Sequence, residues 1–77
     1  MLEKLVEHMV TSLVSKPDSV AISGTEREGK YVIQIRVAAE DVARVIGSEG
    51  RIFRALRAVV VLLGTQQHKD VVLDIAE

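Results

Sequence analysis

The chain has 77 residues, of which 48% are hydrophobic and 27% charged, so it has room for one small domain and the composition of a globular protein. It contains no cysteine, which excludes a disulfide framework, a thiolate zinc site and a cysteine nucleophile. Acidic residues interrupt the apolar run of the first ten positions, so we expect neither a signal peptide nor a membrane span. These features predict a single cytoplasmic domain over residues 1–77.

Charge is unevenly distributed along the chain, although the net charge is only −1. Segment 44–57 contains four arginines and one acid, Glu49, whereas the other residues hold six basic and ten acidic side chains. A basic patch on an acidic body favours an anionic ligand. An ordinary solvated helix face has the same pattern, and charge alone does not separate the two interpretations.

Hydrophobic periodicity predicts the first half of the fold. Apolar residues at helical spacing over positions 2–13 predict an amphipathic helix, which Pro17 prevents from continuing. A short strand is predicted over 18–23 and a polar turn over 24–29. The clearest strand is predicted over 30–37, and its inward residues are Tyr31, Ile33, Ile35 and Val37.

The second half is predicted to contain two helices and a strand. A short helix over 39–46 begins with Glu40 and Asp41, which suit the helix dipole. A second helix over 51–63 is predicted to stop at Gly64, before a strand over 71–75. The residues expected to face the core from that helix are Ile52, Phe53, Leu56, Val59, Val60 and Leu63. The order α-β-β-α-α-β predicts an α+β domain of two layers, a three-stranded sheet with helices on one face.

The segment V-I-G-S-E-G-R-I at positions 45–52 connects the two helices. Gly47 and Gly50 allow a sharp turn and leave room for a phosphate. The N–H groups that begin the next helix form a ready anion site together with the helix dipole. A plain helix–turn–helix connection, in which glycine is common, is the alternative interpretation.

Five further residues extend this candidate site. Arg44, Arg51 and Arg54 would add positive charge around the loop. Val45 and Ile46 would anchor the loop to the core and offer an apolar surface to a ligand held there.

The run VIGSEGRIFRAL resembles the signature of KH domains, in which a V-I-G-x-x-G loop joins two helices and clamps about four nucleotides. The element order matches the prokaryotic, type II arrangement, and the whole chain resembles the small bacterial KhpA family. That resemblance implies binding of single-stranded RNA, RNA-chaperone activity, and pairing with itself or with a multidomain partner of the KhpB (Jag) type. In some bacteria the family is linked to cell elongation, and hence to cell shape.

The loop departs from the usual pattern at its two variable positions, which are Ser48 and Glu49 where the family usually includes a lysine or arginine. A carboxylate about 6 Å from a phosphate costs about 0.7 kcal/mol at water-like screening and about 3 kcal/mol at an effective dielectric of about 20. We therefore expect weak, salt-sensitive binding of RNA. A KH fold used mainly for protein contacts is the alternative.

Helical geometry places Val61 nearly opposite the core, beside Ala58, and Leu62 at the edge of the apolar stripe. We predict a dimer contact at these three residues, with a lone exposed valine as the simpler interpretation. His8 and His68 lie in polar surroundings without a partner at ligand spacing, so both are expected in solvent. We expect no catalytic group, metal, cofactor or small-molecule substrate, and so a binding module. A small enzyme would need convergent titratable groups, and the sequence offers none.

Overall fold

The computed structural model describes residues 2–76 and has the predicted element order. The helices and strands are α1 (Leu2–Thr11), β1 (Ala21–Arg27), β2 (Lys30–Arg36), α2 (Val42–Ile46), α3 (Arg51–Gln66) and β3 (Val71–Ala76). Short 3-10 turns precede β1, α2 and α3, at Pro17–Ser19, Ala39–Asp41 and Ser48–Gly50.

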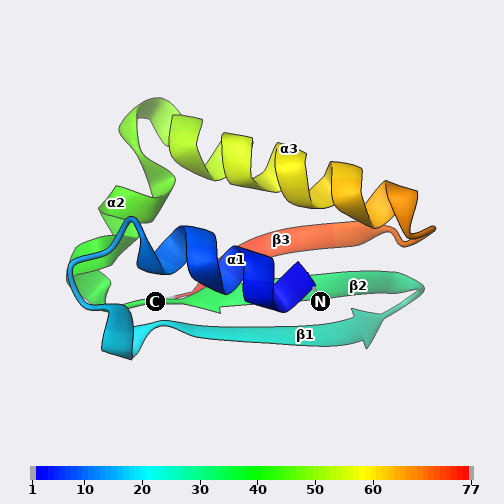
Figure 1. The fold of residues 1–77 in the computed structure, drawn as a ribbon, viewed down its shortest axis with the longest axis horizontal. Helices are drawn as coiled ribbons and strands as arrows, with labels where there is room; N and C mark the ends of the chain where they lie inside the picture. Colours follow the sequence, from blue (N-terminus) through cyan, green and yellow to red (C-terminus); the bar gives the residue numbers. More distant parts are fainter. Residues whose placement is uncertain (1, 77) are drawn as a thin grey trace.

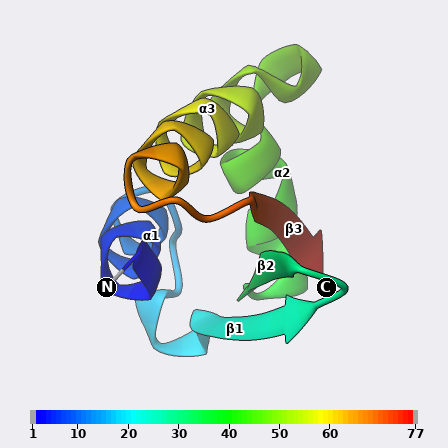
Figure 2. The same ribbon diagram turned by 90° about the vertical axis from the view of Figure 1, so that its right-hand side faces the viewer.

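The sheet has the strand order β1-β2-β3, in which β2 pairs antiparallel with β1 and parallel with β3. The helices cover one face of this sheet (Figures 1 and 2). The α2–α3 connection lies at the opposite end of the molecule from the β1–β2 turn and the α3–β3 turn (Figure 1). The predicted two-layer α+β architecture is confirmed.

The core lies between the helical layer and the sheet. Its buried apolar residues are Leu2, Val6, Val10, Ile33, Ile35, Val37, Val45, Leu56, Val60, Val71 and Leu73. The predicted inward face of β2 is confirmed for Ile33, Ile35 and Val37, whereas Tyr31 is only half-buried. Alternation along β2 and helical spacing along α1 therefore supply two of the walls of the core.

Strand β1 is shifted along the chain from the predicted range 18–23. It begins at Ala21, because Pro17–Ser19 form a 3-10 turn, and it continues through the segment 24–27 that we expected to turn. The turn itself contains Glu28 and Gly29, both with positive φ. Gly24 lies opposite Ile33 in the pairing, and a Cβ there would come 2.1 Å from the Tyr31 hydroxyl. An edge strand with one face in solvent can be polar, so its sequence resembles that of a loop.

Helix α3 does not stop at Gly64, as predicted, but continues to Gln66. Gly64 is buried, and a Cβ there would lie 2.4 Å from Cγ2 of Val71. The helix ends where His68 adopts a φ of +60° and the Lys69 N–H donates to the Gly64 carbonyl at 2.8 Å. This is a Schellman-type end with histidine in the position that glycine usually takes. Gly64 therefore serves close packing of α3 on β3.

The inward face of α3 is narrower than predicted. Leu56 and Val60 are buried, but the Val59 side chain is 43% exposed. Val59 is rotated about 100° from Val60 around the helix axis, which turns it away from the layer below. The prediction that Val59 faces the core is therefore wrong.

Candidate functional site

The loop between α2 and α3 has an unusual backbone. Gly47 has φ +78° and ψ 176°, Glu49 has φ +56°, and Gly50 has φ +73°. The Gly47 conformation is one that essentially only glycine adopts, and a Cβ there would lie 2.6 Å from Cγ1 of Ile52. Around Gly50 the space within 4 Å of a would-be Cβ is open. Gly47 is therefore required for packing and for φ, and Gly50 for φ alone.

Two of the amides that we expected to face a phosphate are engaged inside the loop. The Gly50 N–H donates to the Gly47 carbonyl at 3.1 Å, and the Arg51 N–H donates to the Ser48 carbonyl. These bonds close the 3-10 turn before α3. The loop is thus prefolded, and an anion beside it would depend more on side-chain charge than the sequence implied.

Glu49 contacts both arginines at the start of α3. Its carboxylate lies 3.1 Å from Nη2 of Arg51, and its carbonyl accepts a hydrogen bond from Nη2 of Arg54 at 3.0 Å. The paired side chains of Glu49 and Arg51 are each 73% exposed. An ion pair this exposed contributes between 0 and about 1 kcal/mol, so an incoming phosphate could displace it.

On the α2 side, the predicted residues divide by burial. Val45 is fully buried and anchors the helix, so its side chain has no surface left for a base. Ile46 is half-buried and Ser48 is exposed. Arg44 is also exposed, and its Nε lies 3.4 Å from Oδ1 of Asp41.

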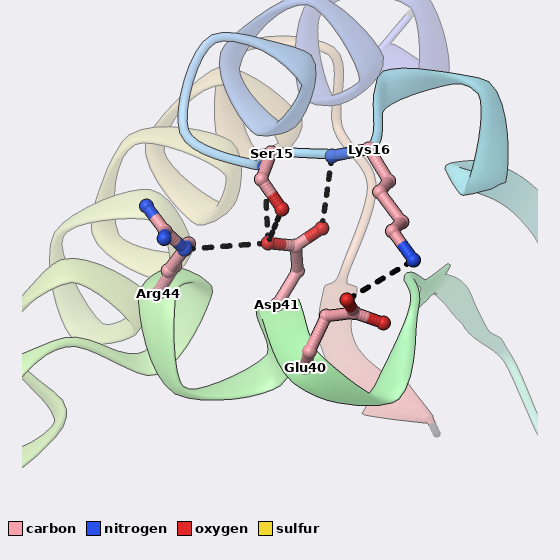
Figure 3. A network of polar contacts seen from close by, with 5 residues as sticks. All are labelled: Ser15, Lys16, Glu40, Asp41 and Arg44. Carbon is pink, nitrogen blue, oxygen red and sulfur yellow. Dashed lines mark hydrogen bonds and ion pairs between the residues drawn. The ribbon is translucent and has the colours of Figure 1, made fainter.

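Asp41 is fully buried, which the sequence did not reveal. Its Oδ1 accepts hydrogen bonds from the N–H and hydroxyl of Ser15, at 3.0 and 2.8 Å, and its Oδ2 accepts one from the Lys16 N–H at 3.0 Å (Figure 3). The pKa of Asp41 is lowered, chiefly by the Ser15 N–H, with the Ser15 hydroxyl, the Lys16 N–H and Arg44 adding to the effect against the opposing influence of burial. The helix dipole therefore does not fully explain Asp41, because its carboxylate also binds Ser15, 26 residues away in the sequence.

The predicted dimer residues form an exposed strip on α3. Ala58 is exposed, Val61 is 38% exposed and Leu62 is 60% exposed. Val59 extends the same apolar strip. Both histidines are exposed, as expected.

At the far end of the sheet, the Tyr31 hydroxyl donates to the carboxylate of Glu3. This bond lowers the pKa of Glu3 and raises that of Tyr31. Lys69 lies over the Tyr31 ring, with Nζ 5.0 Å from the centroid. Within residues 2–76 no group of acids and histidines is placed to hold a metal ion, and no helix is long and apolar enough to cross a membrane.

The fold and the glycine loop define a KH domain of the type II arrangement. The family model described as "KhpA/KhpB, KH domain" matches residues 3–75, and the chain belongs to this family. The "RNA-binding protein KhpA" of Oceanobacillus iheyensis is 42% identical over 74 residues, which cover 96% of this chain and 99% of that protein. The protein of the same name from Listeria monocytogenes is 36% identical over 99% of this chain and 100% of its own. Membership of a family of binding proteins agrees with a non-enzymatic module.

Solved structures of Era share the fold. Era of Aquifex aeolicus bound to GDP and aluminium fluoride matches 96% of this chain with a TM-score of 0.64 and 19% identity. Era in complex with MgGDPNP and nucleotides 1506–1542 of 16S ribosomal RNA matches with the same score and identity. The chain spans 29% and 28% of the two Era chains, so the likeness concerns one part of Era and shows the fold alone.

Proposed function

We propose that this chain binds single-stranded RNA across the loop between α2 and α3. The loop itself carries the proposal, because it joins two helices, contains two glycines with positive φ, and is flanked in the sequence by Arg44, Arg51 and Arg54. The names of the KhpA relatives support the same function. The RNA phosphates would pass over Gly47–Gly50 and meet the guanidinium group of Arg51, with Ile46 beside the bases.

The side-chain contacts favour weak and salt-dependent binding. The amides of Gly50 and Arg51 already donate within the loop, and the carboxylate of Glu49 occupies Arg51. Most of the attraction would therefore come from exposed arginines, whose contribution falls as salt rises.

The chain would act as a single cytoplasmic domain over residues 1–77 and as an RNA chaperone. A second copy, or a KhpB/Jag-type protein, would pack against Ala58, Val61 and Leu62. Exposure of this apolar strip supports the contact, because a chain this small gains stability by covering apolar surface. Two linked domains would also bind one RNA more tightly than either domain alone.

A KH fold used mainly for protein contacts is the second candidate. The neutralised Arg51 and the apolar strip on α3 favour it, since they weaken the RNA site and offer a surface for another protein.

The test is a low-salt fluorescence-anisotropy titration of a short unstructured RNA with wild type, Gly50→Asp and Gly50→Asn. Position 50 is suitable because nothing lies within 4 Å of an added Cβ, and Asp and Asn both tolerate positive φ. Gly47→Asp is unsuitable because it would collide with Ile52. The two variants at position 50 differ in charge alone, so any difference in affinity reports on a phosphate near the loop.

Wild type is expected to bind, and more weakly as salt rises. Gly50→Asp is expected to bind at least about threefold more weakly than Gly50→Asn, the effect of one added carboxylate about 6 Å from a phosphate. Equal affinities would mean that RNA does not bind near the loop. No binding by wild type, with a mass that rises with concentration, would favour the protein-contact function.

A further inference from the structure

Asp41 joins two segments that are far apart in sequence. Its carboxylate accepts three hydrogen bonds from Ser15 and Lys16, which follow α1, while the residue itself precedes α2. The Lys16 side chain adds a second link, because its Nζ lies 3.0 Å from Oε2 of Glu40 (Figure 3). The connection after α1 is thus bound at two points to the turn that begins α2.

These contacts satisfy a buried charge that would otherwise be costly. Asp41 is 0% exposed, and within residues 2–76 no buried side-chain nitrogen or oxygen lacks a hydrogen-bond partner. Three of its four polar contacts are neutral N–H and O–H groups, and the fourth is Arg44. Asp41 therefore has what it needs to stay ionised, without using the whole guanidinium group of Arg44.

The contact with Arg44 uses only one of the three guanidinium nitrogens. Nε of Arg44 faces Oδ1 of Asp41 at 3.4 Å, and Figure 3 shows the other two nitrogens on the side away from Asp41. The Arg44 side chain is 61% exposed, so most of it is accessible to a ligand. Because arginine has a large rotamer entropy, fixing it at Nε lowers the entropy lost when it binds a phosphate.

We infer that Asp41 is a positioning residue for RNA binding, which fixes α2 against the segment after α1 and presents the two terminal nitrogens of Arg44 to a phosphate. This inference rests on the proposed RNA binding. Arg44 precedes Gly47 by three residues on α2, so its guanidinium group and the loop are set by the same short helix.

The direction in which Asp41→Asn changes the affinity for RNA distinguishes a positioning role from simple electrostatics. Asp41→Asn removes a negative charge near the site, and charge alone would make RNA bind more tightly. Loss of positioning acts in the opposite direction and weakens binding. Ser15→Ala is the structural control, because it removes the hydroxyl bond to Asp41 but leaves the contact with Arg44 intact.

The experiment measures RNA affinity and melting temperature for wild type, Ser15→Ala, Asp41→Asn, Arg44→Gln and the double variant of the last two. We expect Asp41→Asn to bind about fivefold more weakly at low salt, while Ser15→Ala melts earlier and binds like wild type. Arg44→Gln should weaken binding about fivefold in wild type and less than twofold in the Asp41→Asn background. Unchanged or tighter binding by Asp41→Asn, or additive effects in the double variant, would overturn the inference.

Two further arms keep the outcome decisive. If Asp41→Asn does not fold, Arg44→Lys gives the answer, because it keeps the charge but loses the planar fork. A loss of about fivefold shows that the planar fork of Arg44 contacts RNA, which the positioning role requires, and wild-type affinity refutes that role. Gly50→Asp in the same series shows whether a negative result concerns the RNA site or only the positioning role. If it weakens binding while the Asp41 and Arg44 variants do not, RNA binding stands and the positioning role falls. If wild type does not bind RNA, both fall.

Discussion

The carboxylate of Glu49 lies 3.1 Å from Nη2 of Arg51, so the acid of the loop neutralises the first arginine of α3. The same residue accepts a hydrogen bond from Arg54 through its carbonyl oxygen. A phosphate that approaches the loop must compete with Glu49 for Arg51 and also experiences the charge of Glu49 itself. If RNA binds at the loop as proposed, Glu49 would therefore lower the affinity for RNA in two ways.

Replacement of Glu49 is expected to tighten RNA binding. Glu49→Gln should raise the affinity about threefold at low salt, and Glu49→Lys should raise it further, since a repulsion of about 0.7 kcal/mol is removed and then replaced by attraction. Glu28→Gln is the matched control, because Glu28 also has positive φ and is exposed, but it belongs to the β1–β2 turn, which lies at the opposite end of the molecule from the loop (Figure 1). Anisotropy titrations at two salt concentrations check this. If Glu49→Lys and Glu28→Gln bind alike, the loop is not the phosphate site.

The two loop glycines are expected to differ in their effect on stability. Gly50→Ala should cost about 1–2 kcal/mol, because alanine is strained at positive φ. Gly47→Ala should cost about 1–3 kcal/mol more, because its Cβ would also collide with Ile52. Urea unfolding of both variants measures the difference. Equal losses would mean that Ile52 moves aside freely.

Helix α3 offers a substitution whose usual effect should be reversed. Glycine to alanine inside a helix ordinarily stabilises by about 1 kcal/mol. Gly64→Ala should instead destabilise by about 1–3 kcal/mol, because the new Cβ would lie 2.4 Å from Cγ2 of Val71. A Val71→Ala background removes the contact with Cγ2 but leaves Cβ of residue 71 at 3.1 Å and the Lys69 carbonyl oxygen at 3.2 Å, so the same substitution should destabilise less there. A stabilising effect in the wild-type background would contradict the close approach.

The sequence predicted elements whose pattern is local. The alternation of Ile33, Ile35 and Val37 identified β2, and the glycine-flanked loop between two helices identified the candidate site. Prediction from the sequence failed where the conformation or burial of a residue depends on contacts with distant parts of the chain. Gly64 was predicted to end the helix, but it allows close contact with Val71. The helix is ended instead by His68, which adopts a positive φ although histidine has no strong preference for that conformation.

The position of the loop between two helices was predictable, and its internal contacts were less so. The arginines and glycines were found because charge and turn residues are visible in the sequence. The pairing of Glu49 with Arg51 and the internal bonds of the loop amides depend on the backbone conformation. The burial and the hydrogen bonds of Asp41 were missed because its partners, Ser15 and Lys16, lie 26 and 25 residues away, and no local pattern connects them.

Asp41 is expected to make the folding stability depend on pH in the acidic range. Its folded-state pKa is lowered, so its stabilising contribution is present above the unfolded value of about 3.9 and is lost as pH falls through the folded pKa. Asp41→Asn should therefore melt several degrees earlier than wild type at pH 7, and the gap should narrow as pH falls below about 4. Melting curves from pH 7 to pH 3 check this. A gap that stays constant would assign the acid sensitivity to other carboxylates, such as Glu3, whose pKa is also lowered.

The apolar strip on α3 leads to a prediction about association. If Val61 lies in a contact between two copies, wild type should be a dimer at high concentration, and Val61→Glu should be a monomer because the interface would bury a carboxylate. Val72→Glu is the matched control, since Val72 is 37% exposed against 38% for Val61 but lies on the uncovered face of the sheet. Light scattering behind a sizing column gives the mass, and circular dichroism confirms the fold. A monomeric wild type, or two variants with the same mass, would remove the α3 strip as the contact between copies and leave it available only to a different protein.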